Sequence, residues 1–179
     1  MTTIETHERA NYIQTMGNFK NIETEFVERT LHLISQYESM LHQYKFEEQY
    51  NHTLLVNCLL GLIVMPKEKT ISFLPKEFLG KELKEKMGVS NSTFNTDITD
   101  LKDLIIALRH TIAHFDISFE SDNQEEFLID KIVFKDREKG ENYVVASFIP
   151  SELLNFIRYY GGWLVNNIRQ HNQKYYEQI

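Results

Sequence analysis

The sequence predicts a mainly α-helical single domain with a small β-hairpin before its last helix. Apolar residues recur at helical spacing along several long segments, and one pair of short segments near the C-terminus is rich in β-branched and aromatic residues. The chain has 179 residues, of which 42% are hydrophobic, so it is long enough to bury a core. We therefore expect residues 1–179 to form one domain.

Two helices are predicted in the N-terminal half. Ile22–Phe46 has apolar residues at spacings of three and four, with Glu and Gln on the other face. A second helix, about Glu47–Val64, carries most of the apolar run Leu54–Met65 and ends before Pro66. This run is too short to cross a bilayer, which predicts a buried helix in which Cys58 is an inert thiol.

The segment Lys67–Thr96 is weakly patterned and predicts loops with one short helix. A further helix then starts at Asp97 or Thr99, since either residue type can cap a helix N-terminus. Apolar residues recur along it at steps of three and four and predict one continuous core stripe, formed by Ile98, Leu101, Ile105, Leu108, Ile112 and Phe115.

The C-terminal third predicts the hairpin and a long helix. Phe127–Lys135 and Tyr143–Ile149 are the two strands, and we expect Asp130 and Asp136, which flank a strand, to face solvent. The last helix runs from Pro150 to about Tyr175. Its Gly161-Gly162 pair indicates either a kink or a close approach of another segment. Helical spacing favours core packing over base stacking for its aromatic residues Phe156, Tyr159, Tyr160 and Trp163.

The helix over residues 97–115 carries a second pattern. Asp103, His110 and His114 share one side of it, because residues four and seven apart stack on a helix. Ile106 and Ala113 are apolar on a side away from the core stripe. The helix is therefore expected to be sandwiched between its own core and something else, either another segment of the chain or a second copy in a homodimer.

Two copies of this helix would suit RNA cleavage. Attack by the RNA's own 2′-hydroxyl needs a base, an acid, and positive charge beside the phosphorane that forms. Paired histidines suit the proton transfers because their ordinary pKa is near neutrality, and the planar fork of Arg109 suits the phosphate.

Several blocks of this sequence resemble the HEPN superfamily (higher eukaryotes and prokaryotes nucleotide-binding domains), in a bacterial, plasmid-associated branch. Arg109-His110-Thr-Ile-Ala-His114 is similar to the signature of that family, an arginine, four residues and a histidine. Three further blocks are similar: NCLLGLIVMPKEK from Asn57, the late hairpin, and SELLNF from Ser151. Together the blocks cover about two thirds of the chain.

This resemblance implies a helical bundle that dimerises through the signature helices and cleaves RNA without a metal or other cofactor, in a toxin or antiviral defence role. By motif match it implies that Arg109 stabilises the scissile phosphate, that His114 transfers a proton, and that His110 positions one of them or the substrate. Asp103, on the same face of the helix as the histidines, is a further candidate for substrate binding or positioning. The resemblance also implies an antitoxin or partner protein. Asp116 stands where some family toxins have a tyrosine that a partner modifies, so that control is not expected. The alternative is a non-catalytic nucleotide- or RNA-binding or assembly module of the same family.

The same residues and the overall charge allow or disfavour several other interpretations. His110 and His114 can simply cap a helix C-terminus, and Arg109 can pair with Asp103 or Asp116. A metal site built from Asp103, His110 and His114 is disfavoured because no third nitrogen or sulfur ligand is near in the sequence. The net charge of −7 disfavours sliding on duplex DNA. The N-terminus lacks the features of a signal peptide, so we expect a cytoplasmic protein with no membrane contact.

Overall fold

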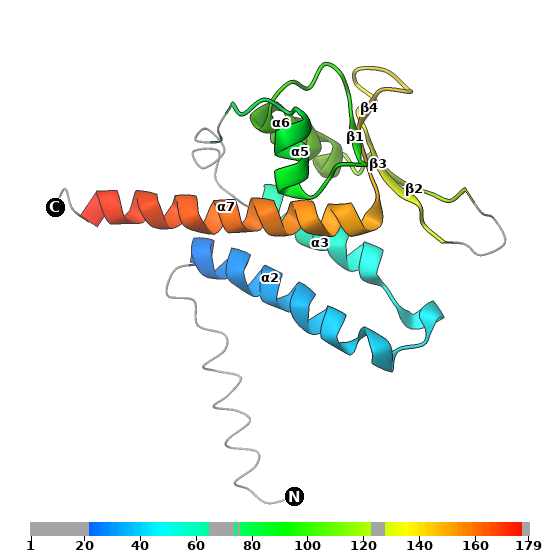
Figure 1. The fold of residues 1–179 in the computed structure, drawn as a ribbon, viewed down its shortest axis with the longest axis horizontal. Helices are drawn as coiled ribbons and strands as arrows, with labels where there is room; N and C mark the ends of the chain where they lie inside the picture. The colour runs from blue at the N-terminus through cyan, green and yellow to red at the C-terminus, as the bar shows by residue number, and fades with distance from the viewer. Residues whose placement is uncertain (1–21, 65–73, 75, 123–127, 177–179) are drawn as a thin grey trace, which may run out of the picture.

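The computed structural model describes residues 22–64, 74, 76–122 and 128–176. Helices form most of this structure, and a four-stranded antiparallel sheet lies at one end (Figure 1). The mainly α prediction is therefore confirmed. None of the described helices is long and apolar enough to cross a membrane.

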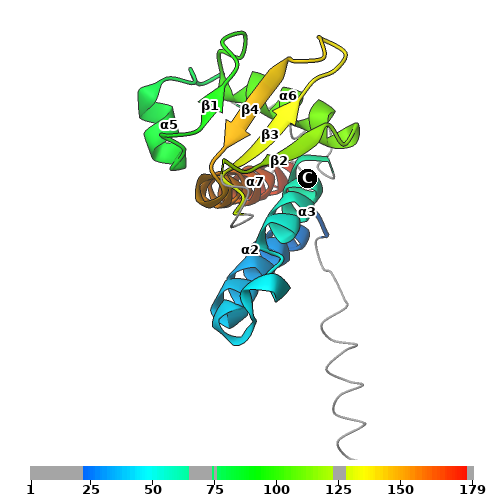
Figure 2. The same cartoon turned by 90° about the vertical axis from the view of Figure 1, so that its right-hand side faces the viewer.

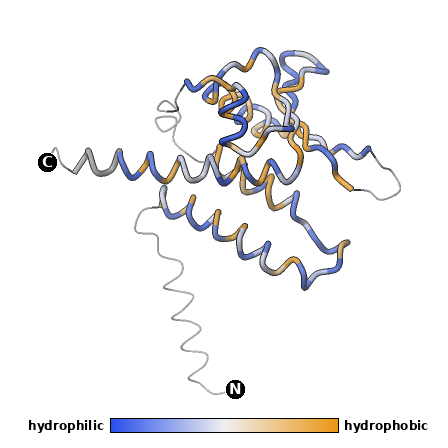
Figure 3. The backbone as a smooth tube through the Cα atoms, viewed as in Figure 1, coloured by the Kyte–Doolittle hydropathy of each residue, from blue (hydrophilic) through white to orange (hydrophobic). Residues whose placement is uncertain are grey.

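The longest described helix, α7 (Pro150–Tyr176), packs against helices that come from different parts of the chain (Figure 1). Helix α2 (Ile22–Met40) packs along it, and α3 (Asn51–Val64) packs against both α7 and the helix that carries the histidines. Figure 3 shows hydrophobic and hydrophilic residues alternating along α2, as expected for a helix with one buried face.

The helix predicted over Ile22–Phe46 is shorter than expected, and the next helix begins later. Helix α2 ends at Met40 and is followed by two 3₁₀ turns, Leu41–Gln43 and Phe46–Glu48. The side-chain amide of Gln49 donates to the carbonyls of Leu41 (3.3 Å) and Tyr44 (3.2 Å). The two carbonyls thus gain hydrogen-bond donors that a longer helix would otherwise have supplied, so the chain can turn before α3. Pro66 lies outside the described residues.

One face of helix α3 is buried, as its apolar sequence predicts, whereas Leu60 on another face is 42% exposed. Leu59, Leu62 and Ile63 are completely buried, and Cys58 is 6% exposed. Burial raises the pKa of the Cys58 thiol to about 11. Its thiolate is therefore scarce near neutral pH, which agrees with an inert core cysteine.

Helix α7 continues without a break through Gly161-Gly162, so of the two expectations for this pair the close approach is confirmed. A Cβ atom on Gly161 would lie 3.0 Å from a methyl carbon of Leu31 in α2. The glycine thus lets the two helices pack closely. Phe156 and Tyr160 are fully buried, which confirms core packing for these two aromatic residues.

The predicted hairpin forms the centre of a larger sheet. Its strands are β3 (Lys131–Lys135) and β4 (Val144–Phe148), paired antiparallel, and Phe127 lies outside the described residues. Two further strands, β1 (Thr93–Phe94) and β2 (Ile117–Glu120), extend the order to β1-β4-β3-β2 (Figure 2). The predicted hairpin is therefore present, but the sequence did not predict the two strands that extend it. Sequence periodicity does not predict the two edge strands, because β1 has only two residues and β2 does not alternate between buried and exposed positions.

The described part of the segment between α3 and the histidine helix, residues 74 and 76–100, contains the short helix α5 (Lys81–Met87). Gly88 ends it in the left-handed conformation (φ 69°), a conformation that favours glycine. The side-chain amide of Asn155 on α7 donates to the Gly88 carbonyl at 3.1 Å.

A buried carboxylate fixes this segment to the start of α7. Glu152 is 8% exposed and accepts hydrogen bonds from the backbone amides of Asn91 and Ser92, the Ser92 hydroxyl and the Asn91 side-chain amide. Burial by itself would raise the pKa of Glu152. The hydrogen bonds from Ser92 and Asn91 together lower the pKa by more than burial raises it, so the pKa lies below its ordinary value.

Glu152→Gln is expected to destabilise the fold by roughly 1.5–3 kcal/mol near neutral pH, the usual effect of losing hydrogen bonds to a charged group. Because the folded-state pKa is lowered, the contribution of the carboxylate is present above the ordinary value of 4.5 and is lost as pH falls through the folded-state value. Urea unfolding across this acidic range should therefore show a smaller difference between wild type and variant as pH falls. Glu82→Gln, an exposed change on α5, is the control, and an equal effect of both changes would contradict this role for Glu152.

Candidate functional site

Helix α6 (Leu101–Ala113) carries the histidines and lies between α3 on one side and strands β3 and β4 on the other. Its N-cap is Asp100, whose carboxylate accepts a hydrogen bond from the Asp103 amide at 2.9 Å. The predicted caps Asp97 and Thr99 were thus wrong by one to three residues. The predicted core stripe is buried at five positions, namely Ile98, Leu101, Ile105, Leu108 and Ile112.

The sixth stripe residue, Phe115, is 76% exposed, so its assignment to the core was wrong. The helix has already ended there. The Asp116 amide donates to the Thr111 carbonyl (2.8 Å) and the Phe115 amide donates to the Ile112 carbonyl (3.1 Å), which is a Schellman motif. Phe115 adopts the left-handed conformation (φ 56°) that this motif requires, at a cost of about 1–2 kcal/mol for a residue with a Cβ atom.

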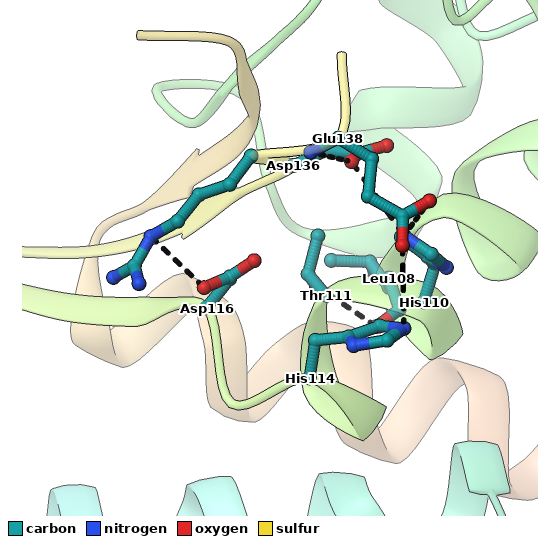
Figure 4. Close-up of polar contacts among 8 residues, drawn as sticks. Leu108, His110, Thr111, His114, Asp116, Asp136 and Glu138 are labelled. Carbon is teal, nitrogen blue, oxygen red and sulfur yellow. Dashed lines mark hydrogen bonds and ion pairs between the residues drawn. The ribbon is translucent and has the colours of Figure 1, made fainter. Parts of the chain in front are cut away.

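The two histidines meet at the C-terminal end of α6, as their spacing predicts. Their ring centroids are 4.5 Å apart, His110 is half-buried and His114 is exposed (Figure 4). His114 is also the C-cap of α6, and its backbone amide donates to the His110 carbonyl. The backbone of His114 therefore caps the helix, as one interpretation of the sequence proposed. The imidazole rings of His110 and His114 instead point toward another part of the chain.

That other part is the turn between β3 and β4. His110 Nε2 lies 3.5 Å from Asp136 Oδ1 and 3.5 Å from Glu138 Oε2, and His114 Nε2 lies 4.0 Å from Glu138 Oε1 (Figure 4). The Glu138 amide donates to Asp136 Oδ1 at 3.1 Å, which holds the turn in this conformation. The turn therefore places two carboxylates against the histidine pair.

The expectation that Asp136 faces solvent was wrong, because it is 5% exposed. Sequence reasoning assigned no role to Asp136 or Glu138. The sequence does show an acidic turn between the strands, but nothing in its periodicity indicates that the turn folds back onto α6. The pairing of β2 with β3 brings the turn there. Asp130 accepts a hydrogen bond from the Asp122 amide at 2.6 Å, away from the histidines.

An open groove of about 520 Å³ runs beside His110. Asp103 and His110 both line it, so the structure brings these two candidates to one surface, although no hydrogen bond joins them among the described residues. The lining is strongly acidic, and its one lysine, Lys139, lies 4.9 Å from the ring of Tyr143. The lining residues are Asp97, Ile98, Asp103, Ile106, Ala107, His110, Asp136, Glu138 and Lys139.

Arg109 does not join the histidine cluster. Its side chain makes no hydrogen bond or ion pair in the part of the chain that the structure describes, so the alternative pairing with Asp103 or Asp116 is not found there. Asp116 instead binds Arg137, with its carboxylate 3.0 Å from Arg137 Nε. The charge of Arg109 acts on Tyr160 of α7. Burial raises the pKa of this phenol, and the nearby guanidinium partly opposes the increase.

The histidine cluster also has the composition of a metal site. His110, His114 and Glu138 each offer one ligand atom, and these three atoms lie within 4.8 Å of one another. The set differs from the one considered from sequence, because Glu138 takes the place of Asp103. The cluster can thus exchange protons through two imidazoles or hold a cation between the imidazoles and a carboxylate.

Comparison with known proteins identifies the family. No curated protein and no solved structure is significantly similar to the chain. A family model described as HEPN pEK499 p136 matches residues 16–171, which is most of the chain and includes α6, the sheet and most of α7. The chain therefore belongs to the HEPN pEK499 p136 family, a branch of the HEPN superfamily.

Proposed function

We propose that this protein is a metal-independent endoribonuclease of HEPN type, acting in a toxin or antiviral defence role. The observation that carries the proposal is the pairing of His110 and His114, 4.5 Å apart at the exposed end of α6, in a member of this family. Arg109 on the same helix supplies a cation with no hydrogen-bond or ion-pair partner among the described residues.

In the proposed reaction, a His114 imidazole removes the proton of the RNA 2′-hydroxyl. The 2′-oxygen then attacks the adjacent phosphorus, and the bond from phosphorus to the 5′-oxygen breaks. A second imidazole protonates that leaving oxygen. Arg109 stabilises the negative charge on the equatorial oxygens of the phosphorane. His110 positions its neighbour His114 or the substrate.

A homodimer through the helix around residues 97–115 would complete this site. Arg109 and His114 are five residues apart, so on one helix their side chains diverge by about 140° at about 100° per residue. Two copies related by a two-fold axis would place Arg109 of one copy near His114 of the other. The exposed apolar side chains of Ile106 (47%) and Phe115 (76%) support such a contact.

The acidic groove determines where RNA can bind. Asp97, Asp103, Asp136 and Glu138 would repel a phosphate inside it. We therefore place the scissile phosphate on the Arg109 side of His114, outside the groove. Asp103, which is exposed at the groove, can accept hydrogen bonds from ribose hydroxyls or base amino groups and so position the substrate.

His114→Ala is expected to reduce RNA cleavage by roughly 10²–10⁴-fold, the usual contribution of a general acid or base. The assay uses single-stranded RNA of mixed sequence in EDTA, with a DNA strand of the same sequence that lacks the attacking hydroxyl. The control is His32→Ala, an exposed histidine on α2, which should leave the rate unchanged. Absence of cleavage under every condition, including added divalent metal, would instead favour a binding or assembly module.

Arg109→Ala is expected to reduce cleavage by roughly 10²–10³-fold, as for the loss of one donor to a developing oxyanion. Arg109→Lys keeps the charge but not the planar fork, so its rate should lie between those of wild type and Arg109→Ala. Single-turnover kinetics separate this effect from RNA affinity. An unchanged single-turnover rate in Arg109→Ala would contradict a role on the phosphate.

Ile106→Glu and Phe115→Glu are each expected to convert the homodimer to monomers, because they place a charge in the proposed apolar contact. Light scattering coupled to size exclusion measures the mass directly. Leu33→Glu, at a side chain 50% exposed on α2, serves as the matched control and should remain dimeric. A dimer that survives both changes on the α6 surface would place the interface elsewhere.

A further inference from the structure

The cluster of His110, His114 and Glu138 has features of a transition-metal site beyond its composition. Two histidines four residues apart on a helix present their rings to the same side, and a carboxylate from a separate turn faces them. This donor set of two imidazoles and one carboxylate is among those that bind zinc with one coordination position left open. Magnesium and calcium prefer oxygen ligands, so the imidazoles favour a metal of the zinc class.

The three ligand atoms lie within 4.8 Å of one another, so the side chains would have to move closer together to bind such an ion. With bond lengths of about 2.0–2.1 Å, ligand atoms around a tetrahedral zinc lie about 3.3 Å apart. His110 Nε2 is 3.5 Å from one Glu138 oxygen, and His114 Nε2 is 4.0 Å from the other. The side chains of His114 (53% exposed) and Glu138 (70% exposed) have room to rotate toward an ion.

The surroundings also favour a cation. Asp136, 5% exposed, holds a carboxylate oxygen 3.5 Å from His110 Nε2 and fixes the turn through the Glu138 amide. It can therefore orient the ligand set or add a further oxygen. The adjoining groove contributes the carboxylates of Asp97 and Asp103, which increase the negative potential at the site.

We infer that His110, His114 and Glu138 form a binding site for a divalent metal of the zinc class, and that occupancy inhibits RNA cleavage. The inhibitory part rests on the proposed function, whereas binding itself does not. A metal bound to Nε2 of His114 blocks the nitrogen that faces Glu138 and prevents that nitrogen from exchanging a proton. Metal-independent cleavage and metal inhibition thus follow from the same pair of histidines.

The binding test uses the full chain, freed of metal with EDTA and exchanged into buffer without chelator. Co²⁺ is titrated while its visible absorption bands are recorded, and Zn²⁺ binding is measured by calorimetry. Wild type should bind one ion per chain. Glu138→Gln should bind at least about tenfold more weakly, since even a change outside the direct ligands costs about 10–100-fold in affinity.

Glu141→Gln is the matched control, because it removes the same charge from an exposed position in the same turn. It should bind metal as wild type does, and circular dichroism checks that each variant is folded. His114→Ala should weaken binding as Glu138→Gln does. Absence of binding in wild type, or equal affinity in wild type and both glutamine variants, overturns the site.

The activity test compares each protein with its own rate in EDTA. Saturating Zn²⁺ should reduce cleavage by wild type and Glu141→Gln at least about tenfold, and excess EDTA should restore it. Glu138→Gln should need a correspondingly higher Zn²⁺ concentration. A rate that rises with Zn²⁺, or inhibition of equal strength in Glu138→Gln, overturns the inhibitory role.

The two proposals can fail separately. Site-specific metal binding by a chain that never cuts RNA would refute the endoribonuclease and leave the metal site in place. Cleavage in EDTA that depends on His114, by a chain that binds no metal, would do the reverse.

Discussion

The end of α6 is the constraint on which the site depends. The Schellman bonds from Asp116 and Phe115 end the helix at Ala113, with His114 as its C-cap, and the chain then enters β2. The Asp116 carbonyl then accepts a hydrogen bond from the Lys135 amide, and its carboxylate binds Arg137. These contacts join the helix end to the end of β3, so the turn that follows β3 must lie over the histidines. The strained backbone of Phe115 is tolerated because the surrounding hydrogen bonds determine it.

This arrangement gives the histidines surroundings that differ from those of Arg109. The imidazoles face carboxylates, which attract cations, while the guanidinium lies on another side of α6, near the buried phenol of Tyr160. The two roles proposed for these residues, proton transfer by the histidines and phosphate binding by Arg109, would therefore be spatially separated within one chain. A second copy is the simplest way to bring the two groups together, and the exposed Phe115 lies at the helix end where such a copy would dock.

The acidic turn has consequences for both proposals. A phosphodiester is repelled by the carboxylates of Asp136 and Glu138, whereas a divalent cation is attracted by them. In the two proposals, RNA and metal are therefore expected on different sides of His114, although both would require its imidazole. RNA and metal would then compete for the side chain of His114 and not for the same space. Regulation of this kind needs no movement of the backbone, since the ligands come from a helix end and a turn that are already in contact.

The amino-acid sequence by itself determined the helices with strong periodicity, the core stripe from Ile98 to Ile112 and the proximity of His110 and His114. These follow from local rules, because residues four apart on a helix are neighbours wherever the helix lies. Only the tertiary structure decided that β1 and β2 complete a sheet, that Phe115 leaves the core, and that Asp136 and Glu138 reach the histidines. These features arise from strand pairing and a helix stop between segments distant in sequence, for which local periodicity carries no signal.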